Sequence, residues 1–423
     1  MNQKIIYPNM SLVKQKLFSS EILEVSRAVE ESISKVMASA NIPIKKGQKV
    51  AVAVGSRGIN QIDSVLYYCL RYLKSIGLNP FIVPAMGSHG GATSIGQINV
   101  LSKLGITEEK MEAPIVSDMD VVSLGELLQG VNVFFSRTAM EADYIVAINR
   151  IKLHTKFRAD IESGICKILS IGLGKEAGAT EFHNSAVKHS FKIIEDAARL
   201  ILSKVNLLFG LSILEDGYGK LSKIEAISKD FLIEREKILL KESASTIGRI
   251  PFDNLDVLII DFIGKDISGI GMDSNVTGRH RDIVGDFYES PHVKRIFVRD
   301  LSPRSDGNGN GIGLADITTK RLVEKLDLEK TYTNSIAAIS PEKAAIPMYF
   351  DTDKKCIDIC AATIGKSSLK EARIVRIKNT SSLYCMQVSE ALKEEVISNP
   401  SLSQISDWIP MGFGEDGNFS FNF

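Results

Sequence analysis

Short apolar runs alternate with amphipathic stretches through the first half of this chain, and this alternation constrains its fold more than any other feature. The runs at 49–54, 79–84, 131–137 and 143–152 are each bordered by glycine or polar residues. The stretch 63–76 between the first two runs has apolar residues at helical spacing. Strands that alternate with helices predict an α/β domain with a mostly parallel sheet.

A second unit of the same kind is predicted to begin at residue 248. The apolar runs 255–263 and 294–301 predict buried strands, and a glycine-rich loop follows each of them. A helix is predicted over 315–326. We therefore expect two α/β domains with mostly parallel sheets, over residues 1–247 and 248–423.

The composition excludes several classes of partner. The chain has 51 basic and 51 acidic residues, whereas a nucleic-acid or anionic-membrane surface needs a basic excess. No apolar run is long enough to cross a bilayer, and the N-terminal residues lack the apolar core of a signal peptide. The five cysteines are scattered, which argues against a disulfide framework. We expect a cytoplasmic protein that binds neither nucleic acid nor membrane.

Polar and glycine-rich segments follow three of the predicted strands. Because ligands of parallel α/β sheets bind beyond the carboxyl ends of the strands, we expect 55–58, 87–91 and 148–155 to converge. His89 lies in the second segment between glycines, which leave space beside its ring. It is either a functional residue or a loop histidine bonded to the backbone.

The segment from Ile148 to His183 collects two of the six histidines, a lysine and several glycines. His154 lies among basic residues that would keep its imidazole neutral and able to act as a base, although a solvated basic loop is the alternative. Lys167 lies between apolar residues, where an amine is either a nucleophile or a side chain that extends to solvent. His183 suits metal ligation, helix capping or a surface position.

The glycines of this segment allow tight turns or a phosphate cradle at a helix start. The segment contains neither GxGxxG nor GxxxxGK[ST], so no standard nucleotide motif applies. In the second domain, Lys265 follows a predicted strand, and its loop is either solvated or directed at a substrate.

Together these residues resemble the nickel-pincer-dependent lactate racemase family of 2-hydroxy acid racemases and epimerases. GSHGGAT at Gly87–Thr93 matches the GxHxxxT loop of that family. Lys167 and His183 are 16 positions apart (183 − 167), as are the family's cofactor lysine and its last histidine. The resemblance covers most of the chain and is strongest over 55–185 and 255–348.

The resemblance implies a nickel-pincer nucleotide, a pyridinium mononucleotide that holds Ni(II) through two sulfur-containing arms. Lys167 would be its covalent attachment point, and His183 would be the protein's ligand in a square-planar nickel site. Ser163 and Gly172 match positions that line the cofactor.

The reaction implied by the resemblance inverts C2 of a 2-hydroxy acid in a cleft between the two domains. Hydride leaves C2 for the cofactor, while His89 and His154, which match the two catalytic bases, remove and return the hydroxyl proton. The domain 1–247 would bind the cofactor, and 248–423 would contribute to substrate binding. The enzymes that build the cofactor are the implied protein partners.

Two features depart from the lactate-specific pattern. The first is a spacing, because His154 and Lys167 are 13 positions apart (167 − 154), three more than in lactate racemases, and the second is a segment. Lactate racemases carry Asp-His-Thr-Arg-Pro after the first strand, whereas this chain has GSRGI at 55–59. Arg57 is then the candidate clamp for the substrate carboxylate, and Lys265 is the candidate substrate lysine of the second domain. A larger or more hydroxylated 2-hydroxy acid, such as a sugar acid, is therefore a candidate substrate on an equal footing with lactate.

Two other functions fit the residues. A zinc-dependent hydrolase would use His89, His154 and His183 to hold a metal-activated water. A non-catalytic protein of the same fold would bind a sugar acid or a nucleotide.

Overall fold

The computed structural model describes residues 5–40, 42–56 and 58–420, so the predicted carboxylate clamp Arg57 lies outside the described residues. The described chain forms two compact units. The N-terminal unit consists of Ser19–His154 and Arg158–Ile247. The C-terminal unit consists of the residues from Gly248 onward, Thr155–Phe157, and the described residues up to Phe18.

The N-terminal unit is built on a sheet with the strand order β3-β2-β6-β7-β8. Neighbouring strands are parallel except for β8, which is antiparallel to β7. The strands are β2 (Lys49–Val54), β3 (Asn79–Pro84), β6 (Tyr144–Arg150), β7 (Leu207–Glu215) and β8 (Leu221–Ile227). The order reverses direction at β2, so the loops after β2, β3 and β6 lie at one edge of the sheet.

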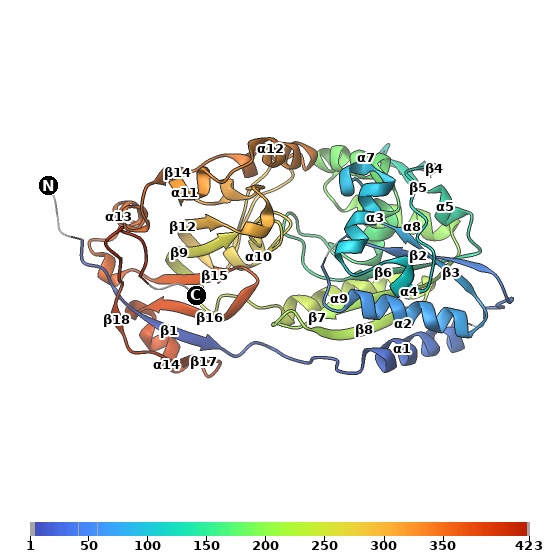
Figure 1. Cartoon of the computed structure of the whole chain (residues 1–423), viewed down its shortest axis with the longest axis horizontal. Coiled ribbons are helices and arrows are strands. Elements are labelled where there is room, and N and C mark those ends of the chain that lie inside the picture. The colour runs from blue at the N-terminus through green and yellow to red at the C-terminus, as the bar shows by residue number, and fades with distance from the viewer. Residues whose placement is uncertain (1–4, 41, 57, 421–423) are drawn as a thin grey trace. The chain divides into compact units, whose positions relative to one another are not determined.

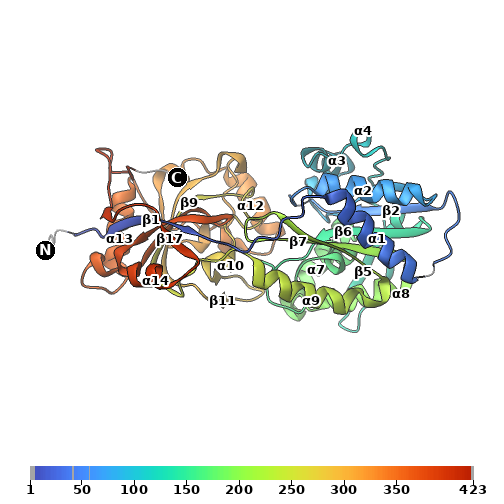
Figure 2. The same cartoon turned by 90° about the horizontal axis from the view of Figure 1, so that it is seen from below.

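Helices cover both faces of this sheet (Figures 1 and 2). Helices α1 (Val25–Ala40) and α2 (Ile62–Ser75) bury their apolar stripes on one face, and α9 (Leu232–Thr246) packs on the other. The further helices of the unit are α3 (Ser94–Lys103), α4 (Glu108–Met111), α5 (Arg137–Met140), α6 (Ile165–Lys167), α7 (Lys175–His189) and α8 (Ile193–Lys204). Burial on both faces explains why the parallel strands are continuous apolar runs.

The C-terminal unit contains a sheet that has nine strands within the described residues, in the order β14-β13-β12-β9-β15-β16-β1-β17, with β18 paired to β1. The five strands from β14 to β15 are parallel, and the others pair antiparallel. These strands are β1 (Asn9–Gln15), β9 (Asn254–Ile263), β12 (His292–Leu301), β13 (Ile317–Thr319), β14 (Met348–Phe350), β15 (Ile374–Asn379), β16 (Ser382–Ser389), β17 (Leu402–Gln404) and β18 (Ile409–Pro410).

Alternate residues along β9 enter two different cores. Leu258 and Ile260 belong to one apolar cluster, while Val257 and Ile259 belong to a second cluster that includes residues of α13. The helices of this unit are α10 (Ser274–Thr277), α11 (Lys320–Val323), α12 (Leu328–Ala337), α13 (Asp353–Thr363) and α14 (Lys393–Ser398), and a short ribbon pairs β10 (Arg279–His280) with β11 (Phe287–Tyr288). No helix among the described residues of either unit is both long enough and apolar enough to cross a membrane.

The α/β class, the two mostly parallel α/β units and a strand within 131–137 are confirmed, but the place of that strand in the main sheet and one predicted helix are wrong. The run 131–137 forms β5 (Asn132–Ser136), which pairs antiparallel with β4 (Val121–Glu126) outside the main sheet. The helix predicted over 315–326 begins as strand β13, because its β-branched residues Ile317 to Thr319 extend the parallel sheet. Thr319 then caps the short helix α11 by accepting from the Leu322 amide.

The division of the chain also differs from the predicted bounds at 1–247. Strand β1, expected in the N-terminal domain, pairs with β16 in the C-terminal unit. Thr155–Phe157 likewise group with the C-terminal unit.

Candidate active site

The sheet of the N-terminal unit brings three of the predicted segments to one edge. Strand β2 lies between β3 and β6 and is parallel to both. The residues after Val54, Pro84 and Arg150 therefore leave the sheet in the same direction from three adjacent strands. Ser56, His89 and His154 follow these three strand ends.

His89 lies in an exposed turn after β3. Its Nδ1 forms a hydrogen bond with the Ser56 hydroxyl, and its backbone amide donates to the Met86 carbonyl at 3.1 Å. The buried Gln97 of α3 donates from Nε2 to the Gly87 carbonyl at 2.9 Å. The Ser56 bond orients the imidazole, and the other two bonds hold the backbone of its loop. Ser56 was missed in the sequence analysis, because its bond to His89 joins two different strand ends.

The His89 loop packs directly on the segment that carries Lys167. The Gly87 amide donates to the Gly172 carbonyl at 3.1 Å. A Cβ atom on Gly172 would lie 2.5 Å from the Ala85 carbonyl oxygen, so only glycine fits there without a shift of the backbone. The structure thus brings two segments of the predicted site together, and Gly172 is a point of close backbone packing between them.

Lys167 ends the short helix α6 and leads into a π-helical turn at Ile168–Gly172. Turns of this kind occur often at functional sites. In the stretch 164–175, Lys167 is the one residue that is not buried. The backbone of Lys167 therefore lies in a buried element, while the residue itself is partly exposed.

Two side chains fix the start of α6. Glu236 of α9 is fully buried, and its Oε2 accepts from the Ile165 amide at 2.8 Å and from the Cys166 amide at 3.2 Å. Asn149 donates from Nδ2 to the Gly164 carbonyl at 2.8 Å. Burial raises the pKa of the Glu236 carboxyl to about 7, although both backbone bonds act to lower it. The sequence contained a signal for Glu236, since this acid lies on the buried stripe of α9.

Phe191 brings His154 and His183 into one neighbourhood. Its ring centroid lies 5.9 Å from that of His183 in an edge-on arrangement and 6.3 Å from that of His154. Both histidines are partly exposed. His183 projects from the middle of α7, so it is a helix-face residue and does not cap the helix.

The loop that carries His154 is closed by its own polar groups. The buried Glu162 accepts from the His154 amide at 2.6 Å and from the Ala159 amide at 3.1 Å. Ser163 donates to the Arg150 carbonyl at 3.2 Å, which ties the end of the loop to the end of β6. The basic loop is thus an ordered turn around a buried carboxylate, and Ser163 closes it.

Lys175 is a second lysine near the His89 loop, and the sequence analysis did not single it out. It is fully buried, has a left-handed backbone with φ of 53°, and donates from Nζ to the Pro84 carbonyl at 2.9 Å. Burial lowers the pKa of this amine to about 8. Its Nζ supports the end of β3 immediately before the His89 loop.

Lys265 lies in the C-terminal unit, in the loop after β9. It is partly exposed and donates from Nζ to the Gly269 carbonyl at 3.1 Å. Lys156, two residues after His154, is buried among Asp282, Ser340 and the Ala338 carbonyl of that unit.

The described residues contain no group of three His, Cys, Asp or Glu side chains placed to hold a metal ion. The ligand set His89, His154 and His183, which a zinc hydrolase would need, is therefore not assembled. A cofactor that supplies most of its own metal donors would need two things from the protein: one imidazole as a further metal ligand and one amine for attachment. His183 and the partly exposed Lys167 offer these two functions.

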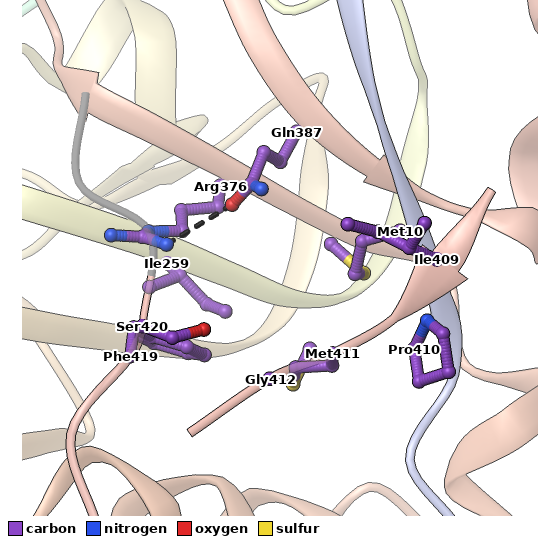
Figure 3. Close-up of a pocket in the computed structure, with 10 residues that line it drawn as sticks. All are labelled: Met10, Ile259, Arg376, Gln387, Ile409, Pro410, Met411, Gly412, Phe419 and Ser420. Atoms are coloured by element: carbon purple, nitrogen blue, oxygen red, sulfur yellow. Dashed lines mark hydrogen bonds between the residues drawn. The ribbon is translucent and has the colours of Figure 1, made fainter. Parts of the chain in front are cut away.

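A cavity in the C-terminal unit involves none of the predicted site residues (Figure 3). Arg376 lies in its wall, donates to Gln387 Oε1 at 3.0 Å, and stacks over the Phe419 ring at 4.4 Å. The full lining is Met10, Ile259, Arg376, Gln387, Ile409, Pro410, Met411, Gly412, Phe419 and Ser420.

The N-terminal unit is therefore a doubly wound α/β domain in which His89 follows β3 and His154 follows β6, the strands on either side of β2. The element that carries Lys167 packs against the His89 loop. Over residues 6–193 the sequence matches the lactate racemase N-terminal domain. This match confirms that residues 6–193 resemble the lactate racemase family.

No curated protein matches the chain. Among solved structures, the lactate racemase apoprotein from Thermoanaerobacterium thermosaccharolyticum aligns with 93% of this chain and 97% of its own, at 14% sequence identity and a TM-score of 0.44.

Proposed function

We propose that this protein is a racemase or epimerase that inverts C2 of a 2-hydroxy acid and uses a nickel-pincer nucleotide attached to Lys167. The observation that carries the proposal is the contact between Gly87 and Gly172 within a lactate racemase N-terminal domain. This contact joins the loop of one proposed base to the element of the proposed attachment lysine.

His89 and His154 are the proposed bases, and an inversion needs one for each enantiomer. The Ser56 hydroxyl forms a hydrogen bond with Nδ1 of His89 and so limits the orientation of the imidazole that would exchange the proton of the substrate hydroxyl. The buried Glu162 holds the backbone of the His154 turn. When bound, the cofactor supplies the acceptor and donor of hydride.

Lys167 and His183 are the proposed cofactor residues, with Ser163 and Gly172 at the lining. Lys167 would hold the group covalently, and the imidazole of His183 would be the nickel ligand from the protein. The nearby Phe191 ring limits how far the His183 ring can turn. The enzymes that build the cofactor are the proposed partners.

Arg57 and Lys265 remain proposed contacts of the substrate carboxylate or hydroxyl groups. Cationic side chains bind a carboxylate by charge-assisted hydrogen bonds. A substrate larger than lactate, such as a sugar acid, is proposed because this chain has GSRGI at 55–59.

The attachment is tested by producing the protein together with the cofactor-building enzymes. The proposal expects one nickel per chain and a mass increase on the peptide that contains Lys167, and both should be lost in Lys167→Ala. Lys188→Ala, an exposed lysine on α7, is the matched control and should retain both. Nickel and activity that persist in Lys167→Ala would overturn the proposal.

The reaction is tested by a screen of 2-hydroxy acids with the loaded protein in deuterated solvent. Inversion with little deuterium at C2 is expected, because the hydride that leaves C2 returns to C2. Extensive deuterium at C2 would indicate carbanion chemistry and contradict the proposed mechanism.

A further inference from the structure

Glu236 has no part in the chemistry proposed above, yet it is the buried acid that contacts the element of Lys167. It belongs to α9, 69 positions after the lysine (236 − 167), and is fully buried. Burial of a carboxyl group costs free energy unless hydrogen bonds replace those it makes with water. Here both backbone bonds fall on Oε2 and come from Ile165 and Cys166, the two residues that precede Lys167.

The space around Glu236 also depends on Gly164. This glycine has φ of 143°, a conformation that other residues rarely adopt. A Cβ atom at position 164 would lie 2.6 Å from the Glu236 carboxyl carbon and from Oε1. The absence of a side chain at Gly164 therefore lets the carboxyl group reach the first amides of α6.

The other side of the same turn is fixed by the sheet. Asn149 of β6 donates to the Gly164 carbonyl, and Ile165 packs against Gly210 of β7, where a Cβ atom would lie 3.0 Å from the isoleucine side chain. Helix α6 has three residues, too few to be stable without such contacts. Its position, and with it that of the Lys167 backbone, is set by these neighbours.

We propose that Glu236 is a positioning residue that places the Lys167 amine for covalent attachment of the cofactor. This inference rests on the proposed function, since it assumes that Lys167 is the attachment point. Glu236 acts through the α6 backbone by accepting from the Ile165 and Cys166 amides, and it has no direct role in proton or hydride transfer.

The test compares two replacements of similar shape. Glu236→Gln keeps a carbonyl oxygen in place of the acceptor, whereas Glu236→Met fills the same space without one. Glu234→Met is the control, because Glu234 lies on the same helix and its side chain is 67% exposed. Each full-length variant is co-produced with the cofactor-building enzymes, and the fraction of Lys167 that carries the adduct is measured by mass spectrometry.

Glu236→Met should lower this fraction at least fivefold, while Glu236→Gln and Glu234→Met stay within twofold of the wild type. An unchanged fraction in folded Glu236→Met would overturn the inference. If Glu236→Met does not fold, Glu236→Asp replaces it, because the shorter side chain withdraws the acceptor from the two amides. The same loss is then expected, and its absence has the same meaning.

A second measurement on the cofactor-free protein separates this inference from the proposed function. Hydrogen exchange at the Ile165 and Cys166 amides should rise at least tenfold in Glu236→Met, and acetylation of Lys167 by acetic anhydride should rise at least threefold relative to Lys188. Glu236→Gln should remain close to the wild type in both. A wild-type protein that never carries an adduct would refute the proposed function, whereas unchanged exchange and acetylation in Glu236→Met would refute the role of Glu236 alone.

Discussion

Lys175 shows how a single buried charge links the candidate site to stability. Its folded-state pKa of about 8 lies below the ordinary 10.5, because burial disfavours the ammonium form. Between these values the folded chain releases the proton while the unfolded chain keeps it, so stability rises with pH over this window. The full change corresponds to about 3 kcal/mol.

We expect Lys175→Met to lose this rise. The free energy of unfolding in urea, measured at pH 7.5 and pH 10, should increase less in the variant than in the wild type. Lys343, whose pKa burial also lowers to about 8, contributes equally to both proteins and cancels in the comparison. Lys188→Met, an exposed change, should retain the wild-type rise; an identical rise in Lys175→Met would contradict the assignment.

Ser56 is the residue whose replacement best tests the orientation of His89. Ser56→Ala removes the hydroxyl that bonds Nδ1 and with it one constraint on the orientation of the ring. In the proposed racemase, kcat should fall on the order of tenfold, because a misplaced base loses part of its contribution. The neighbouring exposed Ser88→Ala is the control. Equal kcat values for both variants would show that the bond does not matter for turnover.

At the scale of elements, the contact between β3 and the π-helical turn depends on Gly172. Gly172→Ala would place a methyl group 2.5 Å from the Ala85 carbonyl oxygen, and the two segments would have to separate. We expect a loss of about 1–3 kcal/mol in the free energy of unfolding, as for other overpacked sites. Gly58→Ala, where no atom lies within 4 Å of the added Cβ, should change little. Thermal and urea unfolding of both variants measure this difference.

The contact of Glu236 with the first amides of α6 should affect the pH dependence of stability. The pKa of Glu236 is raised by burial from 4.5 to about 7, so its contribution is complete below pH 4.5 and is lost as pH rises through 7. The loss is about 3 kcal/mol for this group. Glu236→Gln should remove it, which urea unfolding at pH 5 and pH 8 would detect as a smaller difference between the two pH values. A difference equal to that of the wild type would refute the raised pKa.

The elements that the sequence predicted correctly are those decided by local pattern. Strands β2, β3, β6, β9 and β12 are short apolar runs between glycines and polar residues, and all five lie where the pattern placed them. The segment 315–326 was assigned wrongly because its helical part is only Lys320–Val323, and pairing of Ile317 with Phe297 and Met348 decides the rest.

The candidate site was predictable in part for the same reason. His89, His154, Lys167 and His183 lie in motifs that can be recognised along the chain, and their proposed roles remain predictions. Glu236 acts on residues about 70 positions away, and such a pairing follows from tertiary packing, which local sequence does not encode.

At the scale of the whole molecule, the C-terminal unit contains a buried cluster of charged residues. One of them, Lys156, comes from the short segment Thr155–Phe157, which the sequence places between two parts of the N-terminal unit. Lys156 and Lys343 both contact Asp282 Oδ2, at 3.2 and 3.0 Å, and His280 Nε2 lies 3.2 Å from the same oxygen. Burial would raise the pKa of Asp282, but the His280 bond and the two lysine charges hold it well below its usual range. The carboxylate therefore balances cations that have no access to water.

We expect Asp282→Asn to be strongly destabilising, because it removes the carboxylate that both buried ammonium groups contact. The loss should be about 3–5 kcal/mol, which is usual when one partner of a buried ion pair is removed. Hydrogen exchange should increase in the C-terminal unit. Glu324→Gln, whose exposed carboxylate lies 3.9 Å from Lys320, should cost less than about 1 kcal/mol. Similar stability of the two variants would contradict this account.

Strand β1 is synthesised first among the strands, but the strand it pairs with is synthesised near the end of the chain, and this order affects folding. All five strands of the N-terminal sheet have been made by residue 227, so that sheet can close early. Strand β1 precedes them, yet its partner Ser389 is 379 residues after Met10 (389 − 10). At roughly 5–20 residues per second, the ribosome needs about 20–75 s to deliver that partner. Throughout this time β1 has to remain unpaired and accessible while the neighbouring unit folds, and it joins its sheet only among the last strands.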